Sequence, residues 1–152
     1  HSFPTRRSSD LVRSRVTEGL GLADEAKKAA TIGVATTVDL ANAAANFNAE
    51  VGGAGRASKY VASVQITPAS GLITVTYTAA TGAGAAPTLT LTPWMRDTAA
   101  GQAYAAALTA GTSGAIDWGC ASASNLSLTA NGITRLGGQP TLQSKYAPAQ
   151  CR

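Results

Sequence analysis

Two periodicities divide this chain. Between residues 12 and 35 the apolar side chains recur every three or four positions, which is the spacing of one face of an α-helix. That stripe consists of Val12, Val16, Leu20, Ala23, Ala26, Ala30 and Val34. From residue 60 onward, apolar and polar residues alternate instead, as they do in a half-buried β-strand. This order predicts an α+β domain in which a long amphipathic N-terminal helix packs on an antiparallel β-sheet.

The polar face of the first helix contains charged pairs and two glycines. Arg15 with Glu18, and Asp24 with Lys28, are spaced to pair across one helical turn. The run Gly19–Asp24 superficially matches a dinucleotide-binding fingerprint, but that fingerprint requires a preceding strand. No strand is predicted there, so the glycines are interpreted as members of a packed helix.

A second helical segment is expected after residue 35. Thr36 or Thr37 would cap it, and Asp39 would lie in its first turn near the positive end of the helix dipole. The glycine-rich run at residues 52–55 would end it. Its apolar stripe would be Leu40, Ala43, Ala44 and Phe47. Because residues 41–48 are rich in alanine and asparagine, a weak helix and an ordered loop both fit the sequence.

The alternating region predicts about four strands. In the first, residues 60–67, the even-numbered apolar residues share one face, and a turn at residues 68–71 leads into a second strand at 72–79. A third strand, residues 88–92, should end at Pro93, because proline has no N–H to give to a sheet. The fourth, residues 115–120, places Ile116, Trp118 and Cys120 on one face. Residues 95–114 interrupt the sheet, with a helical turn at 104–108.

The two cysteines lie in the last third of the chain. An even cysteine count without metal-ligand spacing favours one disulfide, between Cys120 and Cys151, in an oxidising compartment. Closing that loop would stabilise the fold by about 3 to 4 kcal/mol. The alternative is a pair of free, buried cytosolic thiols. Within the loop, residues 126–134 are expected to form a small hairpin about Asn131-Gly132.

Composition and charge exclude several function classes. The 152 residues, 45% of them apolar, fit one domain, and the net charge of +4 is scattered, so no nucleic-acid stripe is visible. His1 is the only histidine, which leaves Ser-His or Cys-His catalysis and histidine metal sites without a base or ligand. Carboxylates are scattered too. We therefore expect no enzyme activity, no metal and no cofactor.

Residues 1–11 are polar and unperiodic, and they are interpreted as expression-tag or vector sequence outside the domain. No stretch of 18 apolar residues is present that could span a membrane, and there is no secretion signal.

Several segments together resemble the type IV pilins of Gram-negative bacteria. They are the helix at residues 12–20, the hairpin at 60–77, the strand end Trp118-Gly119-Cys120 and the terminal run 145–151. The last two are similar to the W-x-C and KY-x-P-x-x-C signatures that bracket the C-terminal disulfide loop of the type IVa subclass. The resemblance covers nearly all of residues 12–152.

The resemblance implies a single pilin domain and a structural role. Residues 12–35 would be the C-terminal half of the spine helix, 36–59 a connecting region, 60–120 the sheet and 120–151 the disulfide loop. The chain would be an N-terminally truncated headgroup, because the family's apolar membrane helix and methylated mature N-terminus are absent. In the family, such subunits form an extracellular type IV pilus at the bacterial cell surface, from an inner-membrane pool, and serve adhesion, twitching motility and biofilm formation.

The implied partners are other pilin subunits through the spine helix, host-cell or abiotic surfaces, and phage. Membrane contact would come only through the missing N-terminal segment, and no specific nucleic-acid partner is implied. The candidate adhesive loop is Ser144, Lys145, Tyr146, Ala147 and Pro148.

Two alternatives remain. A pseudopilin of a type II secretion system shares the broad fold, but major pseudopilins commonly end in a calcium-binding loop, for which acidic residues are too few here. A small secreted carbohydrate-binding module could instead use Trp94, Tyr104, Trp118 and Tyr146 as a sugar platform.

Overall fold

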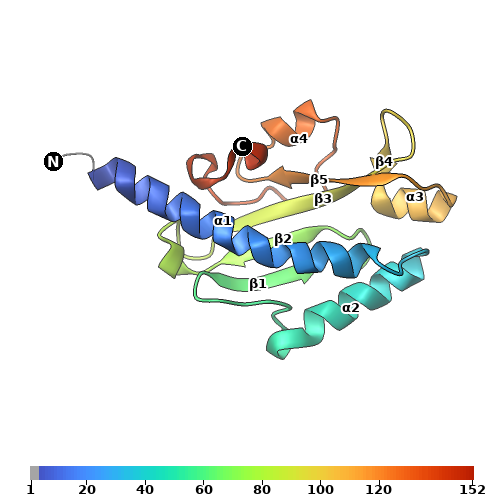
Figure 1. The fold of residues 1–152 in the computed structure, drawn as a ribbon, viewed down its shortest axis with the longest axis horizontal. Coiled ribbons are helices and arrows are strands. Elements are labelled where there is room, and N and C mark those ends of the chain that lie inside the picture. The colour runs from blue at the N-terminus through green and yellow to red at the C-terminus, as the bar shows by residue number, and fades with distance from the viewer. Residues whose placement is uncertain (1–3) are drawn as a thin grey trace.

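A long helix lies across one face of an antiparallel sheet in the computed structural model, which describes residues 4–152 (Figure 1). The helix is α1 (Pro4–Thr31). The strands are β1 (Val61–Ile66), β2 (Ile73–Tyr77), β3 (Thr88–Arg96), β4 (Gln102–Ala103) and β5 (Ala115–Ala121). They pair in the order β1-β2-β3-β4, and β5 pairs with β3 along its whole length. The predicted α+β architecture is confirmed, with five strands.

The predicted apolar stripe holds α1 on the sheet. Val12, Val16, Ala23, Ala26 and Ala30 are all 7% exposed or less, and Leu20 and Val34 pack beside them. We call the sheet face under α1 the front face and the opposite one the rear face.

Two tyrosines bond the backbone of α1. The hydroxyl of Tyr77 donates to the carbonyl of Val16 at 2.8 Å, and that of Tyr104 donates to the carbonyl of Ala30 at 2.8 Å. Burial raises the pKa of both hydroxyls, so they remain protonated donors at neutral pH.

The start and the polar face of α1 differ from the prediction. The helix begins at Pro4 rather than residue 12, and proline is a favoured first helical residue. Arg15 does not pair with Glu18. Its guanidinium donates to the carbonyl of Ala80 at 3.2 Å and lies 5.0 Å from the ring centroid of Tyr60. The Asp24 carboxylate pairs with Lys27 at 3.4 Å rather than with Lys28.

The second segment is a helix, α2 (Thr37–Gly53), rather than a loop. It begins with a capping box: the hydroxyl of Thr36 accepts from the N–H of Asp39, and the Asp39 carboxylate accepts from the N–H of Thr36, each at 3.1 Å. The N–H of Ala35 also donates to that carboxylate, and these bonds lower the pKa of Asp39. Of the predicted stripe, Leu40, Ala44 and Phe47 are buried and Ala43 is half-buried.

Two strand predictions are wrong. A register shift between Val61 and Ser63 breaks the alternation of β1, so Val61 is buried and Ala62 is exposed. β3 does not end at Pro93 but continues to Arg96. On one edge of β3 the pairing with β2 stops at Leu91 and the pairing with β4 starts at Trp94. Pro93 falls in this gap, where a missing N–H is tolerated.

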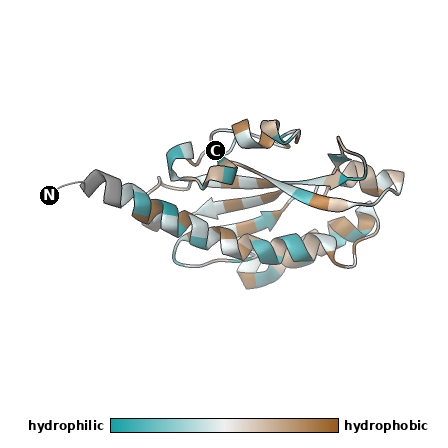
Figure 2. Cartoon of the chain, turned by 45° about the horizontal axis from the view of Figure 1, so that its top comes forward, coloured by the Kyte–Doolittle hydropathy of each residue, from teal (hydrophilic) through white to brown (hydrophobic). Residues whose placement is uncertain are grey.

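Both sheet faces are covered. β3 places Leu89, Leu91 and Met95 in the front core, whereas Trp94 joins a smaller rear core with Ala121, Leu128 and Ile133. Figure 2 shows hydrophobic and hydrophilic residues alternating in bands along the helices and strands. The interruption after β3 contains the predicted helical turn as α3 (Tyr104–Ala110).

The hairpin predicted at residues 126–134 is wrong. That stretch begins with α4 (Leu126–Ala130), followed further along by the short 3₁₀ helices η2 (Ser144–Tyr146) and η3 (Ala149–Cys151). A strand would place Leu126 and Leu128 on the same face. In α4, Leu128 is buried while Leu126 remains 75% exposed.

Candidate functional site

A disulfide joins the end of the sheet to the end of the chain. Cys120 on β5 is bonded to Cys151 in η3, with their Cα atoms 4.6 Å apart. Both cysteines are buried, at 5% and 0% exposed. The predicted pairing is therefore confirmed. Between them, the chain leaves β5, packs α4 on the rear face and returns to the front core at Leu142.

We call residues 122–152 the terminal segment. Its backbone is tied to the sheet near the start of β3, where the N–H of Leu142 donates to the carbonyl of Thr88 at 2.9 Å. The N–H of Ala123 in turn donates to the carbonyl of Leu142 at 2.7 Å. The buried hydroxyl of Ser122 donates to the carbonyl of Cys151 at 2.6 Å, next to the disulfide. These bonds fix the segment at both its ends.

Arg96 connects the sheet to α4. Its guanidinium donates to the Asp117 carboxylate at 2.6 Å, to the carbonyl of Ala100 at 2.9 Å and to the carbonyl of Asn131 at 2.7 Å. The last bond reaches the C-terminal end of α4, where carbonyls lack partners within the helix. The sequence analysis missed this residue, because its partners lie up to 35 positions away.

The candidate adhesive residues lie against α1. Lys145 is exposed, and its ammonium lies 5.0 Å from the ring centroid of Tyr146. Arg13 on α1 donates to the carbonyl of Lys145 at 2.7 Å. Ala147 is fully buried, while Ser144 and Pro148 are half-buried. The five residues thus combine an exposed cation over an aromatic ring with a buried anchor.

The four aromatic residues of the carbohydrate alternative do not form a common surface. Tyr104 is 1% exposed and Trp94 is 9% exposed, with its indole N–H donating to the carbonyl of Ala100 at 2.9 Å. Trp94 belongs to the rear core, whereas Trp118 and Tyr146 pack at the edge of the front core. The predicted sugar platform is therefore wrong for this set.

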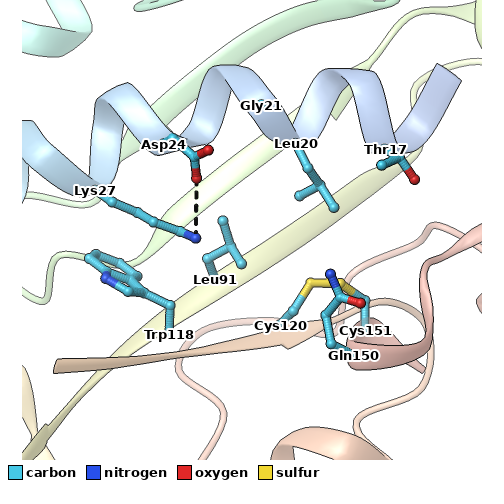
Figure 3. Close-up of a pocket in the computed structure, with 10 residues that line it drawn as sticks. All are labelled: Thr17, Leu20, Gly21, Asp24, Lys27, Leu91, Trp118, Cys120, Gln150 and Cys151. Atoms are coloured by element: carbon cyan, nitrogen blue, oxygen red, sulfur yellow. Dashed lines mark ion pairs between the residues drawn. A yellow bond between two sulfur atoms is a disulfide. The ribbon is translucent and has the colours of Figure 1, made fainter. Parts of the chain in front are cut away.

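A groove of about 310 Å³ runs between α1 and β5 (Figure 3). We call it the disulfide groove, because the Cys120–Cys151 bond lies at its lower side. α1 contributes Thr17, Leu20, Gly21, Asp24 and Lys27, and the facing wall is Leu91, Trp118, Cys120, Gln150 and Cys151. Its apolar side chains are Leu20, Leu91 and the half-buried Trp118, and the Asp24–Lys27 ion pair lies at the α1 side. The sequence analysis did not predict this groove.

The carboxylates that the sequence left unassigned have structural partners. Asp97 accepts from the hydroxyl of Thr112 at 2.6 Å and from the amide of Gln102 at 2.5 Å, and these bonds lower its pKa. Asp117 pairs with Arg96. Within the described residues, no group of three or more His, Cys, Asp or Glu side chains could hold a metal ion. Over residues 4–152, no helix is both long enough and apolar enough to cross a membrane.

The chain thus combines a long helix on an antiparallel sheet with an end that a disulfide ties back to the sheet. A family model described as pilin (bacterial filament) matches residues 12–152, and the chain belongs to this family. Its fold is similar to the crystal structure of a type IV pilin from Pseudomonas aeruginosa strain Pa110594. The two are 44% identical, with a TM-score of 0.86 over 93% of this chain and 98% of that one. A search of curated proteins found no match.

The comparisons confirm the resemblance to type IV pilins. A pilin is a structural subunit that assembles with other pilin subunits into a filament, and a type IV pilus extends from the cell surface. The chain is therefore a pilus subunit, from a family of structural proteins rather than of enzymes.

Proposed function

We propose that the filament built from this subunit serves surface adhesion, twitching motility and biofilm formation. The observation that carries the proposal is the covalently closed terminal segment. Both sulfurs are buried, and one end of the bond lies on β5, which is paired with β3 over seven residues. A filament that pulls on a surface transmits force through its headgroups, and a buried disulfide prevents the terminal segment from peeling away under that force.

Residues 144–148 form the adhesive surface in this proposal. Lys145 offers a cation, and Tyr146 below it offers a half-exposed ring, a combination that suits anionic or polar groups on host cells, abiotic surfaces and phage. The buried Ala147 and the bond from Arg13 hold this surface rigidly against α1. Rigid anchoring lowers the entropy that is lost when a ligand binds.

The remaining assignments follow from the same proposal. Residues 12–152 are the pilin domain, and residues 1–11 are tag or vector sequence. The subunit is held in the inner membrane before assembly, and it packs with other subunits through its spine helix in the filament.

Complementation tests the function. The native gene, placed in a pilin-deleted host, should restore surface pili, twitching zones on agar and biofilm. Failure to form pili would overturn the filament role, whereas pili without twitching or biofilm would overturn the finer roles. A calcium titration separates the pseudopilin alternative, because a clear rise in melting temperature with calcium would favour it.

Lys145→Ala tests the adhesive surface. Pili should form in normal amounts but bind epithelial cells or polystyrene about tenfold less, a loss of about 1.4 kcal/mol. Lys28→Ala, which removes an exposed lysine from α1, is the matched control and should leave binding unchanged. Equal binding by both variants would contradict the adhesive role.

A further inference from the structure

The chain has a single Asn-Gly pair, and it lies at the end of α4. The sequence pattern predicted a hairpin about Asn131-Gly132, whereas the structure uses the pair to end a helix. Asn131 directly follows α4, and Gly132 has φ 72°, in the left-handed region that favours glycine. Both residues are exposed. The fold thus explains the glycine, and it places an exposed asparagine directly before it.

An asparagine followed by glycine can change its own chemistry without an enzyme. The backbone nitrogen of the glycine attacks Cγ of the asparagine, ammonia leaves, and a five-membered succinimide ring forms. Glycine permits this attack because no side chain hinders its nitrogen. Water then opens the ring at one of its two carbonyls. Opening at Cγ gives aspartate, whereas opening at the backbone carbonyl gives isoaspartate, in which the chain continues through the side chain and the backbone carboxylate is free.

In the folded chain, hydrogen bonds hold the reacting groups apart. The N–H of Gly132 donates to the carbonyl of Thr129 at 2.9 Å, and the side-chain amide of Asn131 donates to the carbonyl of Ser127 at 3.0 Å. The ψ angle of Asn131 is 7°, which turns the Gly132 nitrogen away from the side chain that it would attack. Ring closure therefore requires the last turn of α4 to open first.

α4 is a helix that can open without the sheet. It has five residues, and helices this short are marginal by themselves. Leu128 is its buried residue, while Leu126 is 75% exposed. Segments with few buried apolar contacts open locally more often than core strands. The reaction is therefore slowed by α4 but not prevented.

Arg96 acts on the second step, the opening of the ring. Its guanidinium donates to the backbone carbonyl of Asn131 at 2.7 Å, and its bond to the Asp117 carboxylate at 2.6 Å fixes its direction. The succinimide retains this carbonyl. A cation bonded to the carbonyl oxygen stabilises the negative charge that develops when water adds there, and so favours isoaspartate. A pocket of about 250 Å³, bordered by Asp117 and Asn131, gives water access to the ring.

We propose that Asn131 is a modification site that converts spontaneously to isoaspartate, at a rate set by the opening of α4 and with a product set by Arg96. The new backbone carboxylate stays bonded to Arg96. The modified chain has one more backbone atom between Leu128 and Ile133, which both lie in the rear core, so the terminal segment becomes looser. The reaction concerns the single chain and does not depend on filament assembly or adhesion.

Incubation of the purified chain at neutral pH and body temperature for several weeks tests the site. Peptide mapping by mass spectrometry should show ammonia lost and water gained at Asn131. The chain unfolded in guanidinium chloride should react about tenfold faster, because α4 no longer restrains the pair. The other asparagines precede larger residues and should remain intact as internal controls; they are Asn42, Asn46, Asn48 and Asn125.

Two results of this incubation would contradict the proposal. A lack of conversion at Asn131 in the folded chain would overturn the modification site. Equal rates in the folded and unfolded chains would overturn the control of the reaction by α4.

The ratio of isoaspartate to aspartate tests Arg96, and fragmentation by electron transfer distinguishes the two products. The ratio should be about threefold higher in the folded chain than in the unfolded chain, where Arg96 is not held at the carbonyl. Folded Arg96→Met should return to the unfolded ratio. Ser127→Ala is the matched control, since it removes the hydroxyl bond to the carbonyl of Ala149 but leaves Arg96 in place. It should speed conversion without changing the ratio.

Unfolded wild-type chain keeps the Arg96 test valid even if Arg96→Met folds poorly. Equal ratios in the folded and unfolded wild-type chains would overturn the role of Arg96. A fall in the ratio for Ser127→Ala as large as that for Arg96→Met would do the same, because loosening of α4 would then account for it.

Hydrogen exchange of the modified chain tests the loosening. Ion exchange separates this chain, because conversion lowers its net charge by one. Amides of α4 should exchange about tenfold faster than in the unmodified chain, while those of α1 keep their rates. Asn131→Asp is the matched control, since it has the same charge but an unaltered backbone, and it should change α4 less. Equal exchange in the modified and unmodified chains would overturn the loosening.

Discussion

The two sheet faces are covered in different ways. On the front, α1 buries a periodic stripe of small apolar side chains against the sheet. Many similar contacts therefore share in holding this helix. On the rear, the terminal segment contributes the buried side chains of Leu128 and Ile133, and its path is held by a few hydrogen bonds and by one disulfide, which lies in the front core. Removing one of many similar contacts therefore costs the front face little stability. Breaking the disulfide or one of the few hydrogen bonds should instead release the terminal segment.

This difference suits a filament subunit. α1 must stay on the sheet in the assembled filament, and many weak contacts achieve this without any special residue. The terminal segment carries an irregular surface, which cannot supply a periodic stripe of its own. A disulfide can hold such a segment, because it stabilises the fold by restricting the conformations of the unfolded chain. This effect does not depend on which residues lie between the cysteines.

The largest effect should come from removing the disulfide. Replacing both cysteines, Cys120→Ser with Cys151→Ser, should lower the free energy of unfolding by about 3 to 4 kcal/mol. Denaturant titration measures the loss, and hydrogen exchange should show the terminal segment opening before α1. If α1 and the terminal segment exchanged together, the two attachments would not be independent.

Gly19→Ala tests the front face and should be the next largest effect. The added methyl would clash with the Tyr77 ring, and the hydrogen bond from the Tyr77 hydroxyl to the carbonyl of Val16 keeps that ring from moving away. The free energy of unfolding should therefore fall by about 2 kcal/mol. Denaturant titration against Gly21→Ala, where space is open, supplies the control. Loss of stability in both variants would show that helix flexibility, rather than packing, requires the glycines.

Arg96→Met should lower the stability of the fold by an intermediate amount, and the loss should be confined to the rear face. The substitution keeps an apolar stem but removes the bonds to Asp117, Ala100 and Asn131, and it should cost about 1 to 2 kcal/mol. Amide exchange in α4 should accelerate more than exchange in α1. Equal acceleration in both helices would mean that Arg96 stabilises the sheet as a whole.

The smallest effect should be a change in acid stability from Asp97→Asn. Hydrogen bonds from Thr112 and Gln102 lower the pKa of Asp97 below its ordinary value of 3.8. A lowered carboxyl pKa stabilises the fold above pH 3.8, and this contribution is lost as the pH falls through the folded-state value. Melting temperatures followed from about pH 6 downward should therefore decline less steeply in the variant. An unchanged slope would show that Asp97 gains nothing from these partners.

Local sequence patterns predicted the parts of the fold that depend on regular spacing or on neighbouring residues. The stripe from Val12 to Ala30 predicted the front face, and Thr36 with Asp39 predicted the start of α2. The disulfide was predicted from the even cysteine count and the absence of metal-ligand spacing. The failures share a cause, since the path of β3 through Pro93 and the helical form of residues 126–130 depend on neighbours distant in sequence.

The candidate site was predicted less well than the fold. The sequence pointed to residues 144–148, but it did not indicate that Ala147 is buried or that Arg13 bonds Lys145. It also missed the disulfide groove, whose walls come from positions separated by about a hundred residues of chain. No periodic pattern encodes such a meeting, because side chains on unrelated elements come together only after the sheet has formed.

By itself, the sequence determined the class of fold, the helix that covers the front face and the two cysteines that close the chain. Each of these depends on spacing or count within a short window, where backbone geometry and side-chain volume act directly. The tertiary structure decided the path of the terminal segment, the role of Arg96, and the different surroundings of Gly19 and Gly21. Those outcomes depend on which surfaces meet, and a surface exists only once the chain has folded.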